Sequence, residues 1–223
     1  MPISKFFPVI HLLDDAQGRR EADKAFDAGA DGVFFIHPRG DDTMAVRVAQ
    51  EVKKAYPQWY VGINLLASGA VVAFERSIEA GLDAIWADSV GVSSEGLTPM
   101  GHELRKLHLV HPFVDIFAGV AFKYQPQDPN PTGTIYQLSD LGWIPCTSGA
   151  ATGSAASVEK VATLGNASSQ GLGLASGVTL DNVLDYCEHV THFFVATSIS
   201  LDDYTLDFEA MSAMAGRIHR SKA

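Results

Sequence analysis

The chain has 223 residues, of which 47% are hydrophobic and 19% are charged, and its formal net charge is −10. This composition is sufficient for one large hydrophobic core. The excess of negative charge argues against nucleic acid or an anionic membrane as the main partner. An anionic ligand is not excluded, because a few helix N-termini and basic side chains can determine the potential inside a pocket.

The cysteine content and the N-terminal segment place further bounds on the protein. Cys146 and Cys187 are too few for a disulfide framework and lack the spacing of a metal site. The segment MPISKFFPVIHLLDD lacks the layout of a signal peptide, because Pro8 and His11 interrupt its apolar run. No run reaches the roughly 18 apolar residues that a membrane helix needs. We therefore expect a cytoplasmic protein.

Short apolar runs alternate with segments of helical periodicity along the whole chain. The predicted strands are residues 7–13, 33–36, 60–66, 84–87, 116–122, 143–146, 172–175 and 192–196. The predicted helices are residues 18–28, 43–56, 70–80, part of 98–111, 135–141, 155–164, 180–190 and 207–219. Apolar runs separated by helices are typical of a parallel sheet, and eight such units predict one (β/α)8 TIM barrel over residues 1–223. A doubly wound open sheet is the alternative, but it explains less well why every run ends in polar or small residues.

Glycines mark the ends of several predicted helices. Gly29 and Gly81 each follow a helix, where glycine commonly provides the terminating conformation. These two connections are expected to lie at the bottom of the barrel and to serve turn geometry rather than chemistry. Thr43 is predicted to cap the second helix. The proline-rich segment 125–133 is predicted to be a loop and is a candidate lid.

Polar residues at the carboxyl ends of barrel strands commonly bind substrate or take part in catalysis. The candidates at these ends are His11, Asp14, His37, Arg39, Asn64, Asp88, Lys123, Cys146, Ser148, Ser176, Thr197 and Ser198. Among them, Asn64 and His37 are predicted to contact the substrate. No HxH, HExxH or DxD spacing is present, so neither a metal nor a cofactor is expected.

Small and polar residues follow the last three predicted strands. They are Gly149, Ala150, Thr152 and Gly153, then Ser176 and Gly177, then Thr197 and Ser198. Glycines let the backbone approach an anion and hydroxyls add donors, and a phosphate commonly binds after strands 7 and 8 of such a barrel. The predicted ligand is therefore a small phosphorylated metabolite or another anion, although ordinary loops contain the same residue types.

Three residues are the candidates for catalysis: Asp88, Lys123 and His11. Lys123 ends an apolar run and could hold an anion or form a Schiff base, or it could be a lysine that reaches solvent at the rim. Asp88 could transfer a proton or cap the next helix. His11 could transfer a proton near neutral pH, but an isolated histidine in a strand is more often a hydrogen-bonded core residue. Cys146 is expected to be buried, and Cys187 to be structural.

Several short segments together resemble the BtpA family, named for a role in photosystem I biogenesis. They are IHLL at 10–13, VGINLL at 61–66, FK at 122–123, TSGAATG at 147–153, SGVTLDNV at 176–183 and VATSI at 195–199. That family in turn resembles phosphate-binding barrels such as phosphoribosylanthranilate isomerase. In that isomerase a cysteine ending the first strand is the general base, whereas here the run ends at Leu13 and Asp14. The resemblance thus implies the fold, but not the same catalytic residues.

Three functional hypotheses follow. The first is an enzyme of the isomerase or lyase type that acts on a small phosphorylated sugar-like metabolite, with acid/base or imine chemistry. The second is a non-catalytic, BtpA-like barrel that serves assembly or regulation through an apolar surface. The third is a nucleoside or phosphoribosyl hydrolase or transferase that uses Asp88 or the pair Asp14 and Asp15. The sequence leaves the oligomeric state open, although barrels of this size often form homo-oligomers.

Overall fold

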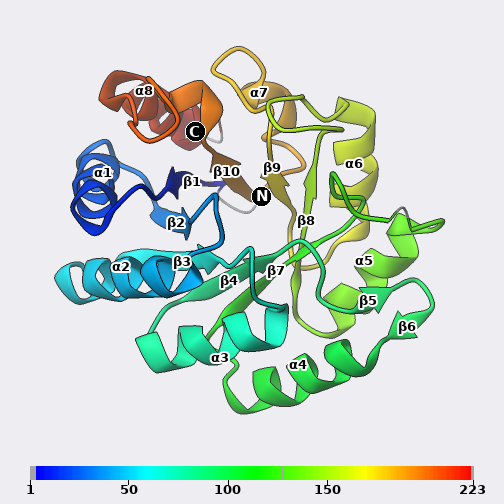
Figure 1. Ribbon diagram of the computed structural model, residues 1–223. Helices are drawn as coiled ribbons and strands as arrows, with labels where there is room; N and C mark the ends of the chain where they lie inside the picture. The colour runs from blue at the N-terminus through cyan, green and yellow to red at the C-terminus, as the bar shows by residue number, and fades with distance from the viewer. Residues whose placement is uncertain (1–3, 127, 222–223) are drawn as a thin grey trace.

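Parallel strands close into a barrel in the computed structural model, which describes residues 4–126 and 128–221 (Figure 1). Around the barrel the order is β1, β10, β9, β8, β7, β4, β3 and β2, and every pair of neighbours is parallel. The strands are β1 (Lys5–His11), β2 (Gly32–Ile36), β3 (Tyr60–Asn64), β4 (Ala84–Ala87), β7 (Asp115–Gly119), β8 (Ile144–Ser148), β9 (Gly173–Ala175) and β10 (His192–Val195). The predicted (β/α)8 barrel is confirmed.

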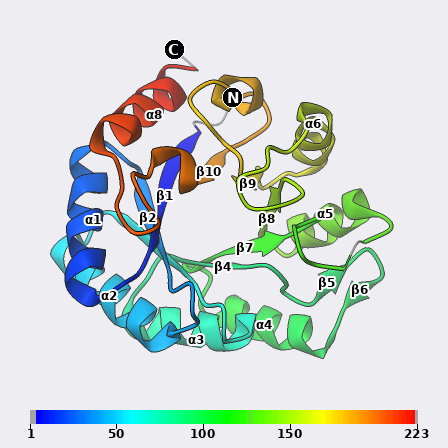
Figure 2. The ribbon, with the colours of Figure 1, turned by 45° about the horizontal axis from the view of Figure 1, so that its top comes forward.

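Helices surround the strands on the outside of the barrel (Figure 2). They are α1 (Asp15–Asp27), α2 (Asp42–Ala55), α3 (Ala70–Ala80), α4 (Pro99–Val110), α5 (Pro131–Asp140), α6 (Val158–Ala167), α7 (Val183–Tyr186) and α8 (Phe208–Arg220). A short 3₁₀ helix, η1 (Thr197–Ile199), follows β10. Helices α1, α2, α3, α5 and α8 pack directly against barrel strands, and α4, α6 and α7 pack against neighbouring helices. No helix in the described part of the chain has both the length and the apolar character to cross a bilayer.

Two elements differ from the prediction in kind. A two-stranded antiparallel hairpin, β5 (Val92–Ser93) and β6 (Gly96–Leu97), lies in the connection that the sequence left irregular. The segment 180–190, predicted as one helix, contains only the four helical residues of α7. The side-chain oxygen of Asn182 accepts a hydrogen bond from the backbone N–H of Thr179 at 2.8 Å, so the chain forms a turn before α7 begins.

The helix ends follow the predicted glycines but not the predicted cap of α2. Gly81 ends α3 with φ of 68°, and Gly29 follows α1 with φ of 83°. The prediction of Thr43 as an N-cap is wrong, because the carboxylate of Asp41 accepts the hydrogen bond from the backbone N–H of Met44 at 3.0 Å. Aspartate is among the best N-cap residues, because its short side chain can accept a hydrogen bond from an N–H group of the first helical turn.

A layer of phenylalanines fills the middle of the barrel. Phe7, Phe34, Phe117 and Phe194 are buried, and their ring centroids lie between 4.9 and 6.4 Å apart. Gly62 leaves room for this layer, because a Cβ there would lie 2.3 Å from the Phe34 ring. These rings therefore close the middle of the barrel, as the packed interior of such a barrel requires.

Candidate functional site

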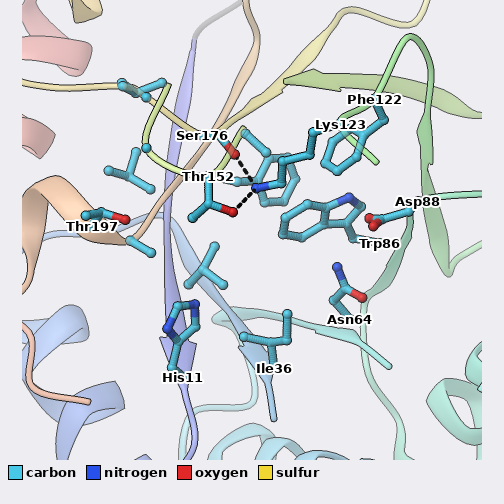
Figure 3. Close-up of a pocket in the computed structure, with 18 of the residues that line it drawn as sticks. His11, Ile36, Asn64, Trp86, Asp88, Phe122, Lys123, Thr152, Ser176 and Thr197 are labelled. Carbon is cyan, nitrogen blue, oxygen red and sulfur yellow. Dashed lines mark hydrogen bonds between the residues drawn. The ribbon is translucent and has the colours of Figure 1, made fainter. Parts of the chain in front are cut away.

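A cavity of about 540 Å³ opens at the carboxyl ends of the strands (Figure 3). Ten of the residues predicted for the site line it: His11, Asn64, Asp88, Lys123, Thr152, Gly153, Ser176, Gly177, Thr197 and Ser198. They come from both halves of the chain and meet because parallel strands present all their carboxyl ends at one face. Trp86 and Phe194 also line the cavity, so the phenylalanine layer borders the cavity through Phe194.

The loops after β8, β9 and β10 form one polar wall of the cavity, which we call the cup and define as Thr152, Gly153, Ser176, Gly177, Thr197 and Ser198. Gly177 has φ of 69° and packs on the loop after β8 so closely that a Cβ would lie 2.3 Å from the backbone of Ser154. Ser176 also has a positive φ, of 75°, which is uncommon for a residue with a side chain. Within the described residues, the backbone N–H groups of Gly153, Gly177 and Ser198 donate to no protein acceptor. The cup therefore offers unused donors, as an anion site requires.

Lys123 lies beside the cup rather than at the end of a strand. β7 ends at Gly119, so the prediction that Lys123 ends the strand is wrong, and the residue lies in the turn that follows. Its Nζ donates to Ser176 Oγ at 2.5 Å and to Thr152 Oγ1 at 3.2 Å (Figure 3). Because an ammonium carries three hydrogens, one donor is left for a ligand.

The turn that carries Lys123 is held in a strained conformation. Ala121 and Tyr124, on either side of it, have φ values of 46° and 62°, a region that is unfavourable for residues with a Cβ. Ser148 Oγ accepts the backbone N–H of Lys123 at 2.8 Å. Lys160 Nζ donates to the carbonyl oxygens of Ala121 and Ser148, both at 2.7 Å. Sequence reasoning missed Lys160, since a lysine on a helix is usually a solvated residue.

We expect replacement of Lys160 by methionine to lower the free energy of unfolding by about 1–2 kcal/mol, because two carbonyl oxygens would lose a charged donor. Urea denaturation would measure the change. Lys106→Met on the exposed face of α4 is the control, and it should leave stability within about 0.5 kcal/mol of the parent. Equal stability of the two variants would contradict a structural role for Lys160.

The titratable groups of the cavity have shifted pKa values. Burial lowers the pKa of Lys123, although the nearby Asp88 acts in the opposite direction. Burial raises the pKa of Asp88, and the charge of Lys123 and the side chain of Asn64 oppose that shift. Burial also lowers the pKa of His11, with Asp203 opposing and Lys123 adding to the effect. The positive charge of Lys123 therefore lowers the pKa of both other candidate catalytic groups, Asp88 and His11.

Asp88 directly follows β4 and points toward Asn64 (Figure 3). Its Oδ1 is buried and has no hydrogen-bond partner among the described residues. Asn64, the last residue of β3, is only 4% exposed. A buried carboxylate oxygen without a donor is unfavourable, so such an atom favours either protonation or a ligand that supplies the donor.

Two predicted site residues lie outside the cavity. His37 turns away, because its Nδ1 accepts the backbone N–H of Asp41 at 2.9 Å at the start of α2. Gly149 packs against the backbone of Ser154, where a Cβ would lie 1.9 Å from the carbonyl oxygen, and it lines a neighbouring cavity of about 510 Å³ instead. Both residues follow strands at the face of the barrel that carries the cavity, but a position after a strand does not determine whether the residue faces the cavity.

The other strand-end candidates have structural surroundings. Asp14 caps α1 by accepting the backbone N–H of Gln17 at 2.8 Å, and Asp15 pairs with Arg47. Cys146 is fully buried in β8, and burial raises the pKa of its thiol well above the ordinary value. Arg39 and Ala150 are exposed and do not line the cavity. Cys187 is buried at the end of α7.

Part of the predicted loop 125–133 belongs to α5, which begins at Pro131. Gln127 lies outside the described residues. The Asp128 carboxylate accepts hydrogen bonds from the hydroxyl and the backbone N–H of Ser94, at 2.8 and 3.1 Å, which tie the loop to the β5–β6 hairpin. A role of the loop as a lid stays a prediction.

No protein-family model matches the chain, and no curated protein sequence matches it, so the resemblance to the BtpA family is not shown by these comparisons. Solved structures do match. KGPDC from Streptococcus mutans has a TM-score of 0.75 at 13% identity, with 99% of each chain covered. The match to phosphoribosyl anthranilate isomerase from Thermus thermophilus has a TM-score of 0.68 at 16% identity and covers 96% of this chain and 98% of that one. 3-keto-L-gulonate-6-phosphate decarboxylase from Vibrio cholerae gives 0.70 at 11%, with 98% of each chain covered. At these identities the likeness shows the barrel fold alone.

Proposed function

We propose that the protein is an enzyme of the isomerase or lyase type that acts on a small phosphorylated metabolite. The observation that carries the proposal is the position of Lys123. Its ammonium is bonded to two hydroxyls of the cup, and its charge acts on both Asp88 and His11. One cation thus links an anion-binding wall to two groups that can transfer protons.

The cup would hold the phosphate of the substrate. Its unused backbone N–H groups and its hydroxyls suit phosphate oxygens, and the third hydrogen of Lys123 would complete the set. The solved structures with the same fold include, by their names, a phosphoribosyl anthranilate isomerase and a 3-keto-L-gulonate-6-phosphate decarboxylase. Their substrates support a phosphorylated ligand here as an analogy of fold.

The three candidate catalytic groups would share the chemistry. Asp88, with its raised pKa, would exchange a proton with the substrate, and Asn64 would orient its carboxyl group. His11, with its lowered pKa, would be a neutral donor or acceptor near neutral pH. Lys123 would stabilise negative charge on an enolate-type intermediate, or its amine would condense with a substrate carbonyl and release water.

A non-catalytic role in assembly is the second candidate, and one surface favours it. Leu109, Val110 and Phe113, at the end of α4 and in the following turn, are 71%, 70% and 69% exposed. Neighbouring exposed apolar side chains of this kind are typical of contacts with other proteins. If this role is the true one, a partner protein should bind with fixed stoichiometry, and no phosphorylated compound should be converted.

Thermal shift with inorganic phosphate and a panel of phosphorylated metabolites tests the proposal. We expect a rise of several degrees in Tm with at least one phosphorylated metabolite, because a ligand that binds only the folded state stabilises it. Ser176→Asp should abolish the rise, since it places a carboxylate in the cup beside Lys123. Ser176→Gly is the matched variant that keeps the positive φ without strain, and it should weaken binding by only about tenfold.

The outcomes separate the alternatives. A rise that Ser176→Asp leaves intact would place the anion somewhere other than in the cup. Folded protein that no phosphorylated compound stabilises would contradict the proposal as a whole. Conversion of the stabilising compound, followed by proton NMR in deuterated buffer, would then identify the proton that the enzyme exchanges.

A further inference from the structure

The wall of the cavity outside the cup is largely apolar. Trp86, Phe122 and Phe194 line it, together with Val9, Ile36 and Leu66. The polar side chains that line the cavity outside the cup are His11, Asn64, Asp88, Lys123, Tyr124 and Thr179, and the first three lie at or directly after the ends of β1, β3 and β4. From this distribution we infer that the organic part of the phosphorylated ligand is an aromatic ring rather than a chain of hydroxyl-bearing carbons. The inference rests on the proposed function and names its substrate class.

Hydroxyl groups would find few partners against this wall. Each hydroxyl of a polyol offers one donor and two acceptor lone pairs, and each loses its water when it enters the cavity. Only the few polar side chains on this wall could pair with such groups, and a hydroxyl that lies against its apolar part has no partner and is disfavoured. An aromatic ring needs only one or two polar contacts at its edge and gains from leaving water. Asn64 and Asp88 are sufficient for that number.

Aromatic side chains form the part of the wall nearest Lys123. The rings of Trp86 and Phe122 are 5.8 Å apart and nearly perpendicular, at 71°, and Trp86 and Phe194 are 5.1 Å apart. Figure 3 shows Trp86 and Phe122 on the same side of the cavity as Lys123, with His11 across from them. Trp86, Phe122 and Phe194 are 7%, 5% and 2% exposed, so each presents a small part of its ring to the cavity. A ligand ring could meet these parts in the tilted geometries that aromatic pairs favour.

The distance between the cation and the rings determines how the ligand is built. Lys123 Nζ lies 5.9 Å from the centroid of the Phe122 ring. A phosphate bound to Lys123 would therefore place the next atoms of the ligand directly against the aromatic wall. A ring attached to the phosphate through one or two atoms fits this distance, whereas a long spacer would carry the ring out of the cavity.

Two exposed side chains that line the cavity carry apolar surface. Leu66 is 48% exposed and Tyr124 is 75% exposed, and both line the cavity. A ligand that carried only hydroxyl groups would leave these side chains in water, whereas a ring would cover them. The covered apolar surface would add to the affinity.

The test compares four simple anions by isothermal titration calorimetry: inorganic phosphate, ribose 5-phosphate, cyclohexyl phosphate and phenyl phosphate. We expect phenyl phosphate to bind roughly tenfold or more tightly than inorganic phosphate and ribose 5-phosphate, which is what burial of part of a ring contributes. Cyclohexyl phosphate should fall between them. Leu66→Ser should weaken phenyl phosphate about threefold or more and leave inorganic phosphate unchanged. Leu109→Ser, at an exposed position on α4, is the control and should change neither.

Each outcome decides between this inference and the proposed function. If ribose 5-phosphate binds at least as tightly as phenyl phosphate, the inference is wrong and the proposed function stands. If cyclohexyl phosphate equals or exceeds phenyl phosphate, the wall selects apolar bulk and not an aromatic ring, and the inference is again wrong. If none of the four anions binds to folded protein, the proposed function fails and this inference fails with it.

Discussion

Replacing Lys123 by methionine should weaken phosphate binding and strongly reduce turnover while leaving the protein folded. The variant keeps the unbranched stem but removes the ammonium that contacts Ser176 and Thr152. Loss of one charge-assisted contact to a phosphate weakens binding by roughly 10- to 100-fold. Turnover should fall by at least about 10²-fold, because the same group stabilises charge or forms the imine.

The stability of Lys123→Met in the absence of ligand distinguishes loss of function from loss of structure. Burial lowers the pKa of Lys123, so the folded state disfavours the charged form. That penalty is present at neutral pH, where the unfolded lysine is charged, and it disappears as the pH rises toward 10.5, the ordinary pKa of a lysine. Methionine carries no charge, so the Tm of the variant at pH 7 should equal or exceed that of the parent. A clear fall in Tm would instead indicate that the lysine is mainly structural.

Lys123→Arg separates the two chemical roles of the residue. Arginine keeps the positive charge but forms no imine with a carbonyl. If Lys123 acts only as a cation, the variant should retain measurable turnover. If it forms an imine, turnover should vanish although binding remains. Borohydride added with substrate would then trap the parent as a secondary amine at Lys123, visible as a mass increase, and would leave the arginine variant unmodified.

The barrel could be predicted from the sequence because apolar periodicity reports burial. The runs at 84–87 and 192–196 correspond closely to β4 and β10, and residues 70–80 match α3 at both ends. The same signal misled at 116–122, where the ladder ends at Gly119. Val120 and Phe122 are buried in a turn that folds into the barrel mouth. Burial alone does not distinguish a strand from a turn that packs on the core.

The residues of the site could be predicted from the strand ends, but the hydrogen bonds that connect them could not. Asp88 and Ser176 follow their strands directly, so the barrel geometry places them at the cavity. His37 occupies an equivalent position, yet a local hydrogen bond to the backbone of Asp41 holds its ring elsewhere. Lys160 supports the turn that carries Lys123, 37 positions earlier, by donating a hydrogen bond to the carbonyl oxygen of Ala121. Because the acceptor is a backbone atom, no residue pattern in the sequence indicates this contact.

The replacement of Asp88 by asparagine should stabilise the protein at neutral pH and remove its activity. Burial raises the pKa of Asp88 above its ordinary value of 3.8, so the folded state binds the proton more tightly than the unfolded state does. The parent is therefore most stable, with respect to this group, below about pH 3.8, and it loses that contribution as the pH rises through the folded-state pKa. Asparagine has the same shape and no charge, so the variant lacks this loss.

Urea denaturation of both proteins between pH 4 and pH 8 checks the sign. We expect the variant to be more stable than the parent at pH 7, and the difference to approach zero toward pH 4. Asp181→Asn, at an exposed position before α7, is the control and should show no such dependence.

Turnover of Asp88→Asn should fall by about 10²-fold or more, because the proton that the carboxyl group exchanges is lost. A variant that is stabilised but fully active would show that Asp88 is buried for some reason other than catalysis. One that is inactive and destabilised at pH 7 would show that the negative charge of Asp88 holds Lys123 in place.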